Sequence, residues 1–515
     1  MHKSIIQFAA TFIVSAAIPA TALAVIDIGS RKQLFIDEKF IEHGRGVDLH
    51  INPCSKYGVV LAGDNSWENG MVQDAVSIIE DGGKYRMWYT ACPASGPELA
   101  PFRLCYAEST DGINWVKPNL GLYEWEGSKA NNIIMDSNIE NGAGVFIDPK
   151  GRPNERYKLL ARLSEKKVFG LGKDPVVPNA PNGSGLYMYT SADGLKWDLH
   201  PTRVFPFVPD TANMAFYDDR AGKYRAYVRT WNPLRRVGVV DMDDIMQPWP
   251  YEKMPPRLWP GRPTDTPAPS REIPEAFGPG PGDPENVDFY TSAVVRYRWA
   301  DDVYFMFPSA YRHFPEPPVG KFRNDGLLDI QLAVSRDGLK FHRVSRLPYV
   351  ELGMKGSGDS GSMYMCIGMI RRGNEIYQYY GGYDFTHGNY VGLPVIRNLG
   401  GVRLTRQRLD GFVSVDAAEN GGEFVTPPVT FQGSQLTLNL NASATGEVHV
   451  ELRESDGRPI AGYTFGESDS IGQNDVARVV TWRGGNADVG SLAGREVRIA
   501  FKLCSVKLYA FQFKD

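Results

Sequence analysis

The chain has few cysteines and lacks the spacings by which proteins hold metal ions. Five cysteines in 515 residues are too few to make disulfide bonds its main support. Cys92 and Cys105 lie on neighbouring predicted strands, where a bridge and two isolated thiols are equal alternatives. No Cys/His spacing is typical of a zinc site. The sequence therefore predicts no catalytic metal and no cofactor, and it leaves open only a structural calcium ion.

An excess of basic residues is also missing. The chain has 56 lysines and arginines against 60 aspartates and glutamates, which gives a net charge of −4. Proteins that bind nucleic acid cluster Lys and Arg against the phosphates. The composition therefore indicates that nucleic acid is not the main partner. It does not determine the oligomeric state.

Long apolar runs are absent after residue 24. Residues 1–24 combine Lys3, an apolar run and small residues ending at Ala24, which is typical of a secretory signal cleaved after Ala24. The run is interrupted by Pro19 and is short for a membrane span; an uncleaved anchor is the alternative. We expect a mature protein without a membrane span that is secreted or periplasmic.

Tyrosine-containing hairpins, in contrast, are abundant. Residues 73–89 contain an apolar strand, an Asp-Gly-Gly turn and a second strand, which is the strongest short-range hairpin signal. Four similar hairpins follow at intervals of 72, 67, 80 and 73 residues. The tyrosines that mark them are Tyr85, Tyr157, Tyr224, Tyr304 and Tyr377. A sheet unit repeated at this length is typical of a propeller blade, so five copies predict a five-bladed β-propeller.

A second repeated pattern, S-x-D-G-x-x-aromatic, supports this register. Its copies start at Ser109, Ser191 and Ser335, one blade and then two blades apart. An Asp-Gly turn lets the Asp side chain bond nearby amides while the aromatic residue packs below. The copies resemble the aspartate boxes of sialidase-like propellers, and we expect them to be structural.

The chain changes character near residue 410, where hairpin repeats give way to strands with alternating polarity. This pattern predicts an all-β protein with a propeller over residues 25–408 and an antiparallel β-sandwich over residues 409–515. Residues 33–41 lie outside the repeats, and we expect them to add a strand that closes the last blade. Residues 255–285 are rich in proline and glycine and predict a surface loop.

Acidic and polar residues precede the first strand of each predicted blade. A single acid there is most often a solvated loop residue, but four acids in the same register favour a shared site at one mouth of the channel. Cleavage of a glycosidic bond needs two carboxyl groups, and a third can tune the pKa of the proton donor. These positions hold Asp74, Asn141, Asp210 with Asn213, Asp288 with Tyr290, and Asp359 with Ser360.

Other polar residues are predicted to reach the same mouth. The ends of second strands carry Arg312 with His313, and Asp384 with His387. The histidines can bind sugar hydroxyls or transfer protons, and a purely structural hydrogen bond is an equal alternative. Upstream of the first blade, Trp67 and Glu68 offer a stacking face and one more acid. The predicted substrate-binding set is Trp67, Glu68, Asn141, Asn213, Tyr290, Arg312, His313, Asp359, Asp384 and His387.

The stretch QDAVSIIEDGGKYRMWY (73–89) resembles the first-blade motif of glycoside hydrolase families 32 and 43, in which Asp-Pro takes the place of Asp74-Ala75. A sandwich after the propeller resembles family 32. The resemblance implies that Asp74 is the nucleophile (family 32) or general base (family 43). The motifs Trp-Met-Asn-Asp-Pro-Asn-Gly, Arg-Asp-Pro and Glu-Cys are absent, so fructan specificity is not implied. By position, Asp210, Asp288 and Glu285 are the candidates for the remaining catalytic roles.

Three functions are compatible with these features. The leading hypothesis is an exported glycoside hydrolase that acts on a polysaccharide or oligosaccharide. A sialidase-like enzyme would use Tyr290 as nucleophile with Arg312 on the substrate carboxylate. A non-catalytic carbohydrate-binding propeller would keep its acids for structural roles.

Overall fold

The computed structural model describes residues 24–68, 72–91, 94–95, 98–99, 103–136, 144–163, 185–207, 209, 212–231, 234–250, 273–315, 325–388 and 400–515. Within these ranges the chain is all-β, as predicted, and its only helices are three short 3-10 turns: η1 (Glu38–Phe40), η2 (Pro153–Glu155) and η3 (Gly490–Leu492). No helix in this part is long and apolar enough to cross a membrane. Residues 1–23 of the predicted signal lie outside the described ranges.

Each of the first three repeats forms one four-stranded antiparallel sheet in chain order. The first contains β6 (Val72–Asp81), β7 (Lys84–Ala91), β10 (Arg103–Ser109) and β11 (Ile133–Asp136). The second contains β12 (Gly144–Ile147), β13 (Tyr157–Leu163), β14 (Gly185–Ser191) and β15 (Asp198–Phe205). The third contains β16 (Met214–Asp218), β17 (Lys223–Trp231), β18 (Arg235–Met242) and β19 (Glu275–Phe277). A small ribbon, β8 (Ala94–Ser95) with β9 (Glu98–Leu99), lies between β7 and β10 in sequence.

The first hairpin has the turn that its sequence predicts. Asp81 pairs with Lys84 across a two-residue turn, in which Gly82 has φ 61° and Gly83 has φ 75°. A primed turn of this type needs positive φ at both central residues, which glycine adopts without steric cost. The Asp-Gly-Gly signal is confirmed.

The interrupted strands of the fourth repeat fall into two groups of three, the first of which is part of an eight-stranded sheet that also includes the fifth repeat. One contains β20 (Val287–Phe289), β23 (Ser309–His313) and β24 (Gly326–Ile330); the other contains β21 (Val294–Arg296), β22 (Tyr304–Met306) and β25 (Ala333–Ser335). In the fifth repeat, β26 (Ser362–Met365) and β27 (Ile370–Arg372) both pair with β28 (Glu375–Tyr383), which pairs with β29 (Gly400–Arg408). A parallel pairing of Leu328 with Ser362 joins the fourth repeat to the fifth.

The strand that completes the fifth repeat is not the one predicted. β5 (Ser55–Ala62) pairs with β29, whereas the predicted closing segment, 33–41, contains β2 (Gln33–Leu34), which pairs with the C-terminal strand β37 (Val506–Lys514). Hydrophobic burial explains the difference. Phe35 and Phe40 have their ring centroids 5.5 and 5.1 Å from that of Phe511 and are fully buried in the C-terminal core.

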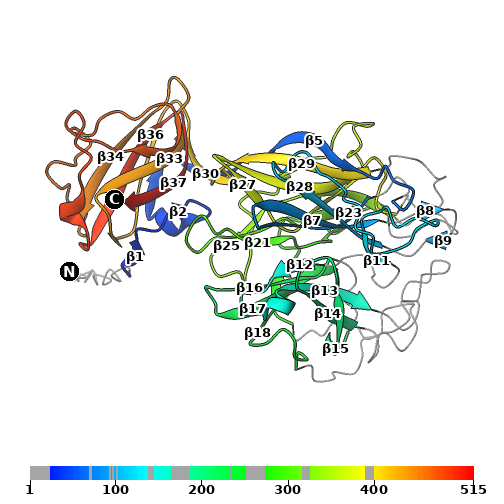
Figure 1. Ribbon diagram of the computed structural model, residues 1–515. Helices are drawn as coiled ribbons and strands as arrows, with labels where there is room; N and C mark the ends of the chain where they lie inside the picture. The colour runs from blue at the N-terminus through cyan, green and yellow to red at the C-terminus, as the bar shows by residue number, and fades with distance from the viewer. Residues whose placement is uncertain are drawn as a thin grey trace, which may run out of the picture.

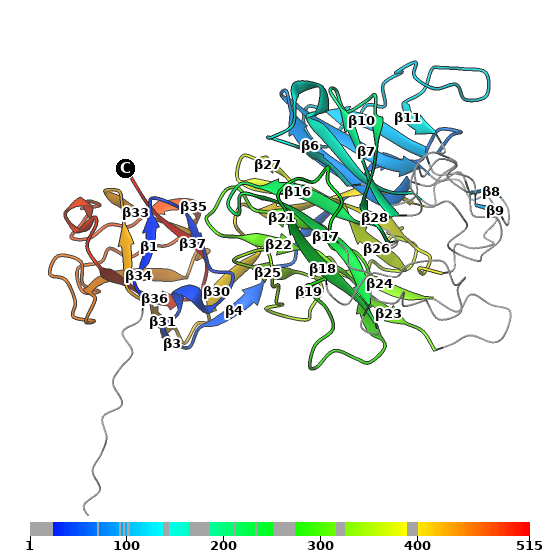
Figure 2. The same ribbon diagram turned by 90° about the horizontal axis from the view of Figure 1, so that it is seen from below.

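The C-terminal part consists of two six-stranded sheets that share one hydrophobic core. One contains β31 (Gly422–Val425), β32 (Val429–Phe431), β34 (Glu447–Glu454) and β36 (Val497–Cys504) with the N-terminal strands β1 (Ile26–Gly29) and β3 (His43–Arg45). The other contains β30 (Val413–Ala417), β33 (Gln435–Asn441), β35 (Asn474–Val479) and β37 with β2 and β4 (Asp48–Ile51). Residues 26–51 therefore belong with the C-terminal sheets, which corrects the predicted boundary at residue 25. Figures 1 and 2 show these blue N-terminal strands among the orange and red ones, beside the repeat sheets.

The three S-x-D-G turns join neighbouring repeats. Within the first turn, Oδ1 of Asp111 accepts hydrogen bonds from the amides of Ile113 and Asn114, both at 2.8 Å. The carbonyl of the turn glycine accepts a hydrogen bond from the second strand of another repeat. These pairs are Gly194 with Trp88 (2.6 Å), Gly338 with Tyr227 (2.8 Å) and Gly112 with Tyr379 (2.7 Å). The structural role predicted for the turns is confirmed, and the last pair links the first repeat to the fifth.

Replacing Tyr379 with phenylalanine removes the hydroxyl that links the first and fifth repeats. We expect Tyr379→Phe to lower the free energy of unfolding by about 1 kcal/mol, the usual net contribution of one buried hydrogen bond. Urea unfolding followed by tryptophan fluorescence measures this loss. Tyr57→Phe is the matched control, because Tyr57 is 51% exposed; an equal loss in both variants would contradict the role of the Tyr379 hydroxyl.

Candidate active site

A buried carboxylate lies between an arginine and a histidine at the start of the fourth repeat. Asp288, on β20, is 2% exposed. Its Oδ2 lies 3.1 Å from Nη1 of Arg235, the first residue of β18, and its Oδ1 lies 3.1 Å from Nε2 of His313, the last residue of β23. Strands of the third and fourth repeats thus bring one carboxylate, one guanidinium and one imidazole together.

This environment keeps Asp288 ionised. Burial by itself would raise the pKa of Asp288, because a low dielectric disfavours the charged form. His313 and Arg235 outweigh burial, and together they hold the pKa of Asp288 below its usual value. An ionised carboxylate can orient His313 or stabilise positive charge, but it cannot donate a proton.

The lowered pKa of Asp288 has a consequence for stability. Because it lies below the unfolded-state value of about 3.9, the ion pair of Asp288 with Arg235 contributes fully above about pH 4 and is lost as the pH falls through the folded-state value. We therefore expect Asp288→Asn to be less stable than wild type at pH 6, and the difference to shrink at pH 3. Urea midpoints at both pH values test this.

The control for this experiment is Asp243→Asn, because the Asp243 side chain is 87% exposed. We expect it to match wild type at both pH values. A stability difference for Asp288→Asn that stays constant between pH 6 and pH 3 would contradict the ionised state of Asp288.

Aromatic rings form a wall beside Asp288. Tyr290, which follows β20, has its ring centroid 4.5 Å from that of His387 and 6.0 Å from that of Tyr311. His313 lies 3.9 Å from Tyr311 between ring centroids, and the hydroxyl of Tyr364 lies 2.6 Å from Nδ1 of His387. We call these five residues the aromatic wall. Such rings combine apolar faces with hydroxyl and imidazole groups, so they can both pack against a ligand and hydrogen-bond to it.

Two arginines of the third repeat reach the aromatic wall. Cζ of Arg229, near the end of β17, lies 4.0 Å from the ring centroid of Tyr290, and Cζ of Arg235 lies 5.4 Å from it. Arg229 is 4% exposed, and its Nε donates a hydrogen bond to the Tyr290 carbonyl at 3.1 Å. Cation–π contacts and this hydrogen bond fix the position of Tyr290.

The first repeat meets the aromatic wall at the last residue of β28. Tyr383 donates a hydrogen bond from its hydroxyl to the carbonyl of Val72 at 2.5 Å, and its ring centroid lies 6.2 Å from that of Tyr364. Val72 begins β6, the strand that contains Asp74. The strand carrying Asp74 therefore begins beside the aromatic wall, although the Asp74 side chain lies outside the described part.

Of the remaining predicted site residues, Asn141 and Asp210 also lie outside the described residues. Asn213 is buried, and its Oδ1 accepts a hydrogen bond from the backbone N–H of Arg229 at 3.2 Å. Asn213 therefore contacts Arg229, and Arg229 in turn contacts Tyr290 of the aromatic wall.

Glu68 and Trp67 both bond to partners in the first repeat, and the predicted ligand contact of Glu68 needs correction. Glu68 is fully buried; its Oε1 accepts a hydrogen bond from the Tyr89 hydroxyl at 2.5 Å, and its Oε2 lies 2.8 Å from Nζ of Lys117. Trp67 donates from Nε1 to Oδ1 of Asn132 at 2.9 Å. A buried carboxylate needs such partners, so Glu68 belongs to a polar network inside the first repeat and does not face a ligand.

The two predicted acids of the fifth repeat also have structural partners. Asp359 is 1% exposed and lies 2.8 Å from both Nζ of Lys56 and the hydroxyl of Tyr380. Asp384 accepts a hydrogen bond from the hydroxyl of Ser360 at 2.7 Å and another from the amide of Gly358 at 2.9 Å. Asp359 is therefore enclosed by structural partners, whereas Asp384 is exposed and holds the turn before β26 through Gly358 and Ser360.

Glu285 and Arg312 are exposed. Arg312 stands between Tyr311 and His313 on β23, and successive side chains of a strand point to opposite faces. Arg312 therefore faces away from the aromatic wall, whereas the predicted residues Asp288, Tyr290, His313 and His387 come together.

The sequence prediction missed four members of this site: Arg229, Arg235, Tyr311 and Tyr364. One signal was available, because Tyr311 stands two positions before His313 and shares its face of β23. The arginines have no local signal, since they come from the third repeat and meet Asp288 and Tyr290 only through tertiary packing.

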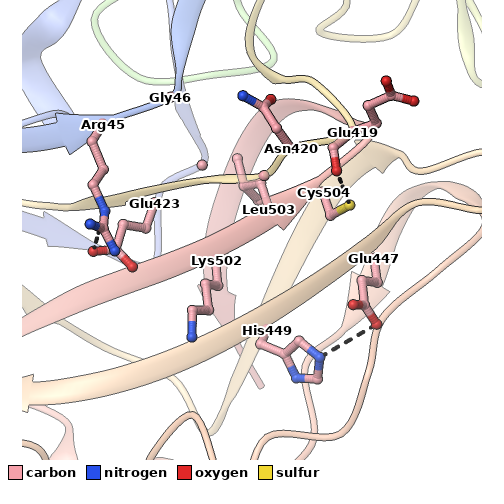
Figure 3. Close-up of a pocket in the computed structure, with 12 residues that line it drawn as sticks. Arg45, Gly46, Glu419, Asn420, Glu423, Glu447, His449, Lys502, Leu503 and Cys504 are labelled. Atoms are coloured by element: carbon pink, nitrogen blue, oxygen red, sulfur yellow. Dashed lines mark hydrogen bonds and ion pairs between the residues drawn. The ribbon is translucent and has the colours of Figure 1, made fainter.

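Neither metal ligands nor the buried thiol of Cys105 form a further site in the part of the chain that the structure describes. Among the described residues, no group of three or more His, Cys, Asp and Glu side chains is arranged to hold a metal ion. Cys105 is a free, buried thiol, and burial raises its pKa well above the usual value. A cavity of about 540 Å³ lies on the C-terminal sheet, where Arg45, Glu447, His449 and Lys502 line it (Figure 3); none of the described site residues lies there.

Comparison of the sequence with known proteins gives a match to part of the chain. No family model matches the chain. A curated, uncharacterized protein of Mycobacterium tuberculosis is 29% identical over 109 residues, which cover 20% of this chain and 36% of that protein; the match thus spans about a third of the relative.

Solved structures resemble more of the chain, at low identity. A putative glycoside hydrolase from Bacteroides ovatus has a TM-score of 0.42 and 14% identity, over 69% of this chain and 97% of its own. A thermostable family-43 glycoside hydrolase has a TM-score of 0.39 and 13% identity, over 70% and 96%. An N-acetylgalactosamine deacetylase from F. plautii, solved with a blood group B trisaccharide, has a TM-score of 0.41 and 14% identity, over 71% and 96%. All three TM-scores are below 0.5, so these likenesses assign no activity to the chain.

Proposed function

We propose that this protein is an exported glycoside hydrolase whose active site contains Asp74, Asp288 and the aromatic wall. The five repeats would form five blades around one axis, and the two C-terminal sheets would form a β-sandwich. The secretory pattern of residues 1–24 supports export. One observation carries the proposal. The buried carboxylate of Asp288 lies between Arg235 and His313, beside aromatic rings on which a sugar ring can pack.

The roles in this proposal follow from charge. Asp288 stays ionised, so it positions His313 and stabilises the positive charge that develops on the sugar ring in the transition state. Asp74 would supply the second carboxylate, as nucleophile or general base. Asp210 and Glu285 are the candidates for the proton donor, and His313 is a further group that can transfer protons.

A panel of neutral and acidic polysaccharides, assayed for released reducing sugar, tests the proposal. We expect the full-length protein to cleave at least one member, and His313→Gln to reduce that activity with the melting temperature unchanged. Binding of a polysaccharide without any cleavage would favour the non-catalytic hypothesis.

A sialidase-like activity is the second candidate, because Arg229 and Arg235 both lie beside Tyr290. Tyr290 would act as nucleophile, and the arginines would bind the substrate carboxylate in place of the exposed Arg312. Release of sialic acid from a reporter substrate, lost in Tyr290→Phe, would support this activity over the first.

A further inference from the structure

A basic cavity of about 560 Å³ lies where the repeats meet the C-terminal sheet that contains β33, β35 and β37. Six basic side chains line it, against one carboxylate, that of Asp301. They are Arg31, Lys32, Arg296, Arg298, Arg371 and Lys514. Its volume falls in the range of small-ligand sites, which often lie at junctions of this kind.

Half of these cations have a carboxylate partner. The pairs are Arg31 with Asp301 (3.0 Å), Lys32 with Asp410 (2.8 Å) and Arg296 with Asp219. Arg298, Arg371 and Lys514 form no ion pair with any carboxylate in the ranges that the structure describes. They come from the fourth repeat, the fifth repeat and β37, so folding brings three uncompensated positive charges to one cavity. Like charges that line one cavity repel one another, and a bound anion would relieve that repulsion.

An aromatic ring accompanies the cations. Trp299 is half-buried at the cavity, where Tyr297 holds it edge-on with ring centroids 5.1 Å apart. Gln512 and Thr437 add polar groups from the C-terminal sheet. A cavity of this size exceeds what a single inorganic anion fills, and the ring provides a flat apolar face that inorganic anions do not use.

We propose that this cavity binds an acidic oligosaccharide. Its carboxylate or sulfate groups pair with Arg298, Arg371 and Lys514, where guanidinium groups can bind two oxygens at once, and a sugar ring packs on Trp299. None of the residues of the aromatic wall lines this cavity. The site would therefore hold the protein to an acidic polysaccharide whether or not the aromatic wall cleaves a glycosidic bond.

Affinity electrophoresis of the full-length protein tests the proposal, with polygalacturonate, dextran sulfate and neutral dextran in the gel. We expect at least one acidic polymer to retard the protein and neutral dextran not to. The triple variant Arg298→Gln, Arg371→Gln, Lys514→Gln keeps the aliphatic stems, so we expect it to fold normally and to lose at least about tenfold in affinity. Retardation by only one acidic polymer identifies the group as carboxylate or sulfate.

The matched control removes three positive charges elsewhere on the surface, as Arg45→Gln, Lys502→Gln, Arg458→Gln. We expect it to bind like wild type. If both triple variants lose the same affinity for the acidic polymer, the effect comes from the overall charge of the protein, and the proposal is overturned. Retardation by neutral dextran equal to that by the acidic polymers would overturn the proposal. An affinity for a single-stranded oligonucleotide equal to that for the acidic polymers would also overturn it. In wild type, binding that does not weaken with added salt would contradict the ionic contacts.

Discussion

Replacement of Asp74 by asparagine is expected to lower the rate of glycosidic cleavage by at least about 100-fold, because general acid–base groups contribute that much. Asparagine keeps the size of the side chain and removes its charge, so it can act neither as nucleophile nor as base. The measurement is release of reducing sugar from whichever polysaccharide the wild type cleaves, with unfolding followed in parallel to show that the fold is kept.

The matched control is Glu80→Gln, which removes a carboxylate from the opposite end of the same strand. Glu80 is exposed on β6, six residues beyond Asp74. We expect this variant to keep its activity within about twofold, in line with a surface position away from the site. Retained activity in Asp74→Asn would remove Asp74 from the mechanism and leave Asp288 and His313 as the groups to examine.

The largest expected loss of stability comes from Asp410, which joins the three parts of the fold. Asp410 is fully buried between β29 and β30. Its Oδ1 accepts a hydrogen bond from the Tyr297 hydroxyl of the fourth repeat at 2.8 Å, and its Oδ2 lies 2.8 Å from Nζ of Lys32 and 3.0 Å from Nδ2 of Asn439 on β33. One carboxylate thus ties a repeat, the N-terminal segment and the C-terminal sheet together.

Asp410→Ala leaves Lys32, Tyr297 and Asn439 without their shared acceptor. Breaking a buried ion pair by removing one partner costs about 3–5 kcal/mol, and we expect a loss of that size in urea unfolding. Asp410 also has φ 65°, a conformation that asparagine tolerates better than alanine, so Asp410→Asn should lose less.

Asp416→Ala serves as the control for this variant, because its side chain is 21% exposed and pairs with Lys507 at the surface. Partly exposed pairs contribute about 1 kcal/mol or less. A loss in Asp410→Ala no larger than in Asp416→Ala would show that the junction does not depend on this carboxylate.

Part of the candidate site was predictable from local pattern. Asp288 and Tyr290 were predicted because the pattern places them at the start of a blade, in the register of other acids, and His313 and His387 because the pattern places them at the ends of second strands. The prediction failed where a side chain has a choice of partners. Glu68, Asp359 and Asp384 were predicted to face a ligand, yet each bonds to groups that folding places beside it, such as Lys117, Lys56 and Ser360. A sequence pattern gives the position of a carboxylate but not which cation will neutralise it.

The sequence by itself determined the all-β class, the first hairpin and the structural turns, because glycine, aspartate and alternating apolar residues act through contacts only a few residues apart. The tertiary structure alone decided which strand completes the fifth repeat, which residues surround Asp288, and that Arg298, Arg371 and Lys514 share one cavity. The physical reason is that these outcomes depend on competition for burial and for charge partners between segments hundreds of residues apart. Phe35 and Phe40 illustrate it: their pattern is that of any apolar strand, and only the core around Phe511 determined where they are buried.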